Sequence, residues 1–68
     1  MVEKETRTRQ AARLRILAEL TERIGREIAG MDGPHAREML RIGQTLGIAT
    51  DELQVIAQRL EHPRAAWR

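Results

Sequence analysis

Aliphatic residues recur every three or four positions between residues 14 and 28, and this spacing constrains the fold more than any other feature. Five of them share one face of a helix: Leu14, Leu17, Leu20, Ile24 and Ile28. Ile16 and nearby alanines widen this face to roughly 200°, about twice the arc that a surface helix buries. We therefore predict a long first helix over residues 4–29, with more apolar surface than a protein of this size can hide.

The segment after this helix contains signals for a turn and a second helix. Gly30 is a typical residue at the end of a helix, and Pro34 suits the first turn of the next one. Apolar residues then recur at helical spacing as far as Leu46. The sequence therefore predicts a second helix over residues 34–46.

A third helix is expected after a tight connection at residues 47–49. Thr50 would be its N-cap, and the helix would cover residues 51–61. Residues 62–68 would form a tail, in which Trp67 is a candidate anchor for a partner's pocket. The expected fold is a single all-α domain of three helices over residues 1–68, with a long first helix followed by a helix-turn-helix-like pair.

The composition points to association with another molecule. A chain of 68 residues with no cysteine cannot use disulfides or thiolate metal sites to offset a small core. His35 and His62 are the only imidazoles, and no paired carboxylates stand at a helical spacing from either, so we expect neither a metal nor a cofactor. The remaining remedy is a partner, most simply a homodimer through the first helix. The alternative is that Ile16 or Leu20 is merely exposed.

Charge is distributed unevenly along the chain, although the net charge is only +2. Residues 1–18 carry five basic and two acidic residues, whereas residues 19–62 carry five basic and eight acidic ones. The basic ends could contact phosphate or an acidic protein, or could simply be solvated helix faces. No apolar run approaches the roughly 20 residues of a membrane span, so we expect a cytoplasmic protein with no membrane contact.

A pattern between residues 39 and 60 combines a small residue, a glycine four positions later with apolar neighbours, and two apolar anchors beyond. Its members are Gly43, Leu46, Gly47, Ile48, Leu53 and Ile56. This stretch resembles a helix-turn-helix. The resemblance implies a regulator of transcription that binds duplex DNA as a dimer, with the third helix in the major groove. For such a regulator, the compact, arginine-rich sequence points to a bacterial, plasmid or phage source.

That resemblance also implies which residues contact DNA. The candidates are Thr50, Gln54, Val55 and Gln58 for the bases, with Arg41 and Arg13 for the phosphates. Asp51 and Glu52 oppose this assignment, because their negative charges balance Arg41 and Arg59, the two arginines between residues 39 and 60. Positive charge would therefore have to come from the first helix and the tail.

Two other functions are compatible with the same residues. One is a helical adaptor or chaperone-like protein that binds a protein partner through its apolar first helix. The other is a degenerate relative of the helical chorismate mutases. Arg37 and Glu38 resemble the Arg-Glu pair that opens the second helix in that family. We find no nucleophile with a nearby base and no phosphate-binding loop, so we expect no catalytic residues and no enzyme.

Overall fold

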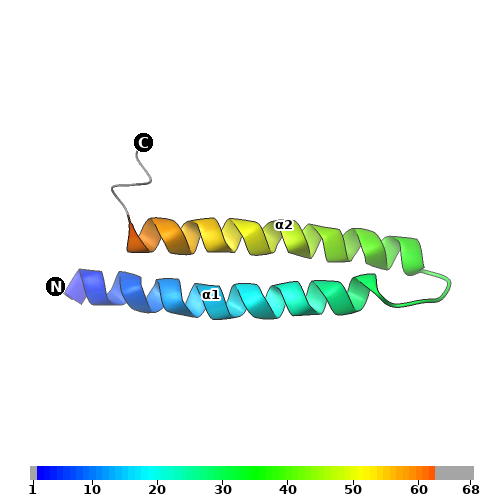
Figure 1. Ribbon diagram of the computed structural model, residues 1–68, viewed down its shortest axis with the longest axis horizontal. Coiled ribbons are helices and arrows are strands. Elements are labelled where there is room, and N and C mark those ends of the chain that lie inside the picture. The colour runs from blue at the N-terminus through cyan, green and yellow to red at the C-terminus, as the bar shows by residue number, and fades with distance from the viewer. Residues whose placement is uncertain (1, 63–68) are drawn as a thin grey trace.

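The chain folds as an antiparallel helical hairpin. The computed structural model describes residues 2–62, with side chains from residue 5 onward. Helix α1 covers Val2–Ala29 and helix α2 covers Ala36–Glu61, and the two lie side by side along their length (Figure 1). The described residues contain no strand, so the all-α prediction is confirmed.

The prediction of three helices is wrong, because α2 is continuous through residues 47–49. A glycine inside a helix costs about 1 kcal/mol but does not end it, and here packing against α1 stabilises the helix on both sides of Gly47. Thr50 lies inside α2 and is not an N-cap. Its hydroxyl donates to the carbonyl of Leu46 at 2.8 Å. The predicted ends at residues 29 and 61 are confirmed, and α2 begins at residue 36 instead of 34.

The turn between the helices depends on one glycine with a left-handed backbone. Gly33 has a φ of +123°, a conformation that residues with a side chain rarely adopt. Its carbonyl accepts a hydrogen bond from the Ala36 amide at 3.2 Å, which starts the first turn of α2. Glu38 lies in that first turn, where a negative charge is favourable beside the helix N-terminus. The turn therefore reverses the chain within six residues.

Small residues line the contact between the two helices. The fully buried positions repeat every seven residues on each helix: Ala11, Ala18 and Gly25 on α1, and Gly43, Thr50 and Ala57 on α2. At the narrowest point a Cβ added to Gly43 would lie 2.5 Å from the Gly25 carbonyl oxygen and 2.7 Å from the Ala29 Cβ. The backbones of α1 and α2 therefore approach closely at Gly25 and Gly43, because neither residue has a side chain.

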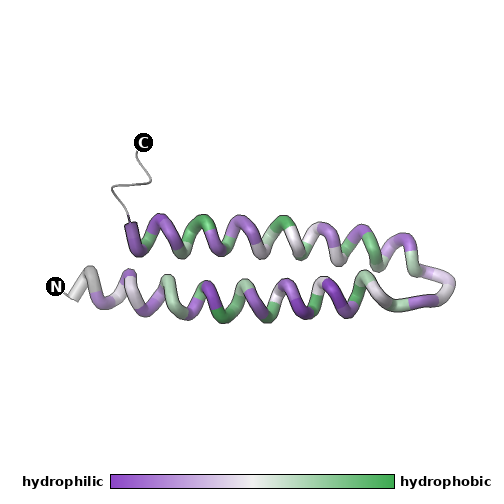
Figure 2. The backbone as a smooth tube through the Cα atoms, viewed as in Figure 1, coloured by the Kyte–Doolittle hydropathy of each residue, from purple (hydrophilic) through white to green (hydrophobic). Residues whose placement is uncertain are grey.

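This small-residue contact leaves the larger side chains only partly covered. No large side chain of the described residues is fully buried. Half-buried ones follow the small residues on both helices: Leu14, Ile28, Met39, Leu46, Leu53 and Leu60. Apolar and polar residues alternate along both helices without a long apolar run (Figure 2), and no helix in the described range could cross a membrane. The radius of gyration is 15.3 Å, against about 11 Å for a compact domain of this length.

Replacing Gly43 by alanine should destabilise the hairpin, although alanine is the better helix former. The added methyl group would overlap backbone and side-chain atoms of α1, so the helices must separate. We expect the Gly43→Ala variant to lose about 1–3 kcal/mol of unfolding free energy. Urea unfolding followed by circular dichroism, at one fixed protein concentration, measures this loss.

The matched control is Gly47→Ala, one turn further along the same helix. Nothing lies within 4 Å of a Cβ added at Gly47, so this variant should gain about 0.5–1 kcal/mol from helix propensity. A loss of stability in Gly47→Ala would contradict a continuous α2, because a turn glycine with positive φ would resist alanine.

Candidate protein-binding face

The seven-residue repeat divides the hairpin into two flanks. On each helix, residues four positions after a buried small residue lie on one flank, and residues one position before it lie on the other. In an antiparallel pair, positions of the same type meet on the same side. One side of the hairpin therefore consists, on both helices, of the residues four positions after a buried small residue. The opposite side consists of the residues one position before it.

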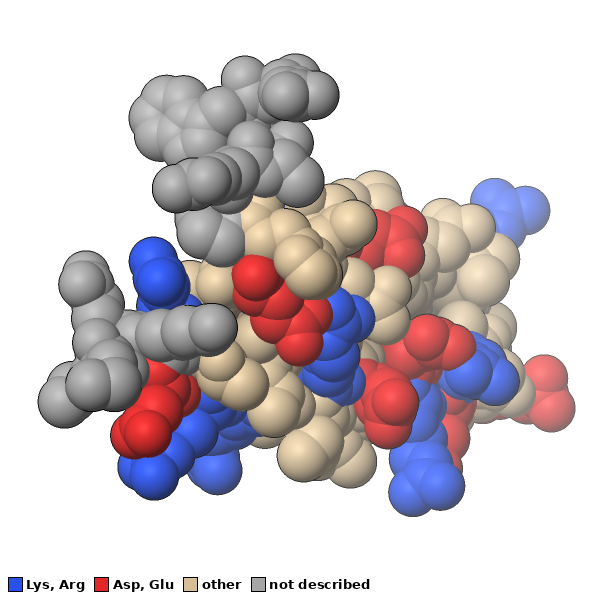
Figure 3. All heavy atoms as spheres, turned by 60° about the vertical axis from the view of Figure 1, so that its left-hand side comes forward, with Lys and Arg blue, Asp and Glu red and all other residues tan. Residues whose placement is uncertain are grey.

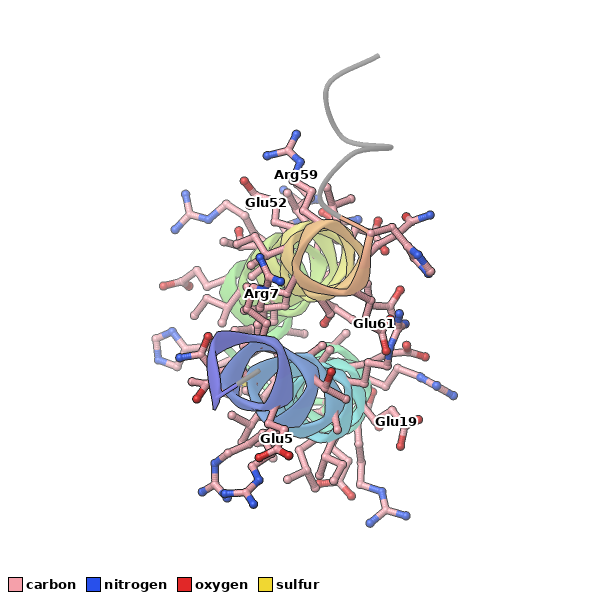
Figure 4. All side chains as sticks on the ribbon, turned by 90° about the vertical axis from the view of Figure 1, so that its left-hand side faces the viewer. Glu5, Arg7, Glu19, Glu52, Arg59 and Glu61 are labelled. Carbon is pink, nitrogen blue, oxygen red and sulfur yellow. The ribbon has the colours of Figure 1, made fainter. Side chains whose placement is uncertain are left out.

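The first side is mostly polar, although the exposed Leu40 also lies on it near the turn, and it is closed by an ion pair. Its members include Arg15 and Glu22 on α1 and Gln54 and Glu61 on α2. Arg15 donates to the carboxylate of Glu61, which joins the two helices near their open end. Viewed along the hairpin, Glu61 lies at one side and its side chain extends toward α1 (Figure 4). This ion pair confirms which flank of α1 lies beside which flank of α2.

The opposite side is aliphatic on both helices. Leu17 and Ile24 occupy it on α1, and Ile42 and Ile56 occupy it on α2, with Leu20 at its edge. These five residues are named here the apolar face. Their exposed fractions are between 40% and 50%, and the half-buried leucines of the contact layer continue the same surface. The apolar face is the one extended aliphatic surface that both helices build together in the described part of the chain.

Other exposed aliphatic residues are scattered on the outer surfaces. Ile16 on α1 and Ile48 on α2 are 59% and 63% exposed and point away from the partner helix. A shallow hollow of about 480 Å³ runs past Ile16, but all its lining residues belong to α1. It is therefore the surface of a single helix and not a pocket between elements.

The predicted interface residues of the first helix divide into two groups. Leu14 and Ile28 are half-buried and belong to the contact with α2. Leu17, Leu20 and Ile24 belong to the apolar face. The long first helix therefore does carry exposed apolar surface, but Ile42 and Ile56 of α2 carry part of the same surface. The helix-turn-helix pattern predicted that Ile56 is instead an anchor between two short helices.

The residues predicted to read DNA bases do not form one exposed row. Thr50 is 2% exposed and packed between the helices, so its hydroxyl cannot reach a ligand. Gln54, Val55 and Gln58 do lie together, in an open hollow of about 500 Å³ on the polar side that Arg15 also lines. Without a turn at residues 47–49, this segment does not project from the hairpin as a recognition helix would.

The predicted phosphate-binding residues lie apart. Arg13 is on the first half of α1, whereas Arg41 is near the start of α2, at the end of the hairpin that contains the turn. Acidic and basic side chains alternate over the surface in view in Figure 3, so that surface has no stripe of a single charge. Phosphate backbones are bound by clustered positive charge, which this arrangement does not provide.

The candidate chemical groups are also separated. His35 and His62 flank opposite ends of α2, and no group of three potential metal ligands occurs among the residues that the structure describes. Arg37 and Glu38 are exposed at the start of α2, and Glu38 hydrogen-bonds His35 at 3.1 Å. Trp67 and the arginines of the tail lie outside the described residues.

Comparison with protein-family models, with curated proteins and with solved structures finds no match to this chain.

The sequence signal for the apolar face was the seven-residue spacing of the small residues. If Ala11, Ala18 and Gly25 form the contact layer, then Leu17 and Leu20 lie on faces of α1 that do not contact α2. The leucine stripe predicts a different buried face, because large aliphatic residues are usually the better guide to a core. The predicted center of the contact therefore lies about a quarter turn from its actual position.

Removal of the Arg15–Glu61 ion pair should have a small, salt-dependent effect. The two side chains are 46% and 31% exposed, so solvent and salt screen their attraction. We expect Glu61→Gln to lower the unfolding free energy by about 0.2–1 kcal/mol at low salt and by less at 1 M salt. Glu19→Gln, at an exposed position outside the contact and the apolar face, is the control, and an equal loss in that variant would contradict a specific role for the pair.

Proposed function

We propose that this chain is a non-enzymatic helical module whose function is to bind a protein through its apolar face. The observation that carries the proposal is the asymmetry of the hairpin's two sides. One side is closed by the Arg15–Glu61 ion pair, and the other presents five large aliphatic side chains that are each about half exposed. Contiguous apolar surface of this kind marks interaction sites in proteins.

Isolated exposed aliphatic residues would not support the proposal, because they are common on protein surfaces. Here they are aligned along two helices and continue into the half-buried leucines of the contact layer. A partner helix placed on this surface would bury both groups at once. The result would be a core with layers of large side chains, as in a helical bundle, which the hairpin alone lacks.

DNA binding receives no comparable support. The helix-turn-helix resemblance requires a turn at residues 47–49, and α2 has none there. Of the arginines near the start of α1, Arg15 is already paired with Glu61. A regulator that binds duplex DNA is therefore kept as an outcome of the test and not as the conclusion.

A photoreactive side chain placed on the apolar face tests the proposal. We replace Leu20 in one variant and Ile48 in another by the same photoreactive phenylalanine analogue, and irradiate cells that express the full chain. Mass spectrometry then identifies the adducts. We expect protein adducts from position 20 and few from position 48, because Ile48 lies on the outer surface of α2.

Substitution by glutamate on and off the apolar face supplies a control for the same experiment. Leu17→Glu should suppress the position-20 adducts, whereas Ile48→Glu should not, because Ile48 lies on the outer surface of α2. Equal adduct yields at positions 20 and 48, or retention of duplex DNA at about 150 mM salt with salt-dependent loss, would refute binding of a protein through the apolar face.

A further inference from the structure

We infer that the partner is a second copy of this chain, docked apolar face on apolar face with the two turns at opposite ends. The inference rests on the proposed function and specifies both the partner and its orientation. In this arrangement α1 packs against α1 of the other copy, and α2 against α2, each pair running antiparallel. A two-fold axis then crosses the middle of the apolar face, and every contact occurs twice.

The row of residues along α1 at this face is self-complementary about its center. It begins with a positive residue, continues with three aliphatic ones and ends with a negative residue: Arg13, Leu17, Leu20, Ile24 and Glu27. Arg13 and Glu27 each lie seven positions from Leu20. A two-fold axis at Leu20 therefore brings Leu20 against its own copy and sets Arg13 beside the partner's Glu27.

The row along α2 has the same property with the charges in the opposite order. Its members are Glu38, Ile42, Thr45, Ala49, Glu52, Ile56 and Arg59. Ile42 and Ile56 each lie seven positions from Ala49, so a two-fold axis at Ala49 packs Ile42 on the partner's Ile56. Glu38 and Arg59, eleven and ten positions from Ala49, then fall near each other across the interface, and a small residue sits where the helices approach most closely.

Both centers lie at the same level of the hairpin, so a single axis satisfies both rows. Gly25 and Gly43 are in contact. Leu20 lies five positions before Gly25, whereas Ala49 lies six positions after Gly43. The two centers therefore differ by about 1.5 Å along the helices, the rise of one residue. Nothing in the packing of a lone hairpin requires this coincidence.

The alternative two-fold arrangement, with both turns at the same end, is less favourable. It would place α1 against α2 of the other copy in the register of the hairpin itself. Glu27 would then come level with the partner's Arg41 and lie three positions from its Glu38, so it would face charges of both signs. Opposite turns instead set each of the four rim charges beside a charge of opposite sign; these are Arg13, Glu27, Glu38 and Arg59.

The exposed area of the chain is consistent with a dimer. Its accessible surface is 5957 Å², against about 4,400 Å² for a compact monomer of the same mass. An elongated two-helix shape leaves this excess uncovered, and docking of a second copy on the apolar face would remove part of it.

The orientation is tested with distances between spin labels in the purified full chain. The chain has no cysteine, so Asp32→Cys gives one labelled site in each turn. Opposite turns predict a label separation of about 36 Å, twice twelve residues at 1.5 Å each. Turns at the same end predict less than about 20 Å, the width of two neighbouring helix pairs.

Charge reversal tests the pairing of Arg13 with the partner's Glu27. Sedimentation equilibrium from about 1 µM to 1 mM gives the dissociation constant of the dimer. Arg13→Glu alone and Glu27→Arg alone should each weaken the dimer by about tenfold, because each creates two like-charge contacts. The double variant should return to within about threefold of the original chain, and circular dichroism checks that each variant remains helical.

The outcomes separate this inference from the proposed function. A dimer with labels near 36 Å and rescue by the double variant supports the inference. A dimer with labels below about 20 Å overturns the orientation but leaves the apolar face as a protein-binding surface. A chain that stays monomeric while position 20 still captures another protein overturns self-association alone. A monomer without adducts at position 20 overturns both.

Discussion

The contact between Gly25 and Gly43 is the constraint on which the rest of the structure depends. Two backbones meet there with no side chain between them, and alanines and Thr50 continue the same close approach toward the open end. Close packing gains dispersion energy at many atoms and leaves no void. It also limits how much large aliphatic surface the two helices can cover, because leucines cannot enter so narrow a gap.

The hairpin's two sides follow from that limit. Most leucines and isoleucines excluded from the contact layer lie beside it on the side opposite Arg15, Glu22 and Glu61. A two-helix protein of this length buries little apolar area and is marginal by itself. Packing of a second hairpin on the apolar face would convert the half-exposed residues into a core and would explain why both helices carry them.

Much of the secondary structure was predictable, and the error at residues 47–49 has a clear physical cause. Gly47 is a helix breaker by propensity, and Thr50, Asp51 and Glu52 are typical of a helix start, so local signals favoured a turn. Packing decided otherwise, because a straight α2 keeps Gly43, Thr50 and Ala57 in line with the small residues of α1. The stabilisation along the whole helix exceeds the local preference, which amounts to about 1 kcal/mol.

The sequence by itself determined the helical class, the reversal between residues 30 and 35, the aliphatic character of the core and the excess of apolar surface on the first helix. The tertiary structure decided which face of each helix is inside. Two periodic patterns overlap in this chain, one of small residues and one of leucines, and either could form a buried stripe. Only the pairing of both helices selects the first, because the backbones can approach closely where small residues from both meet.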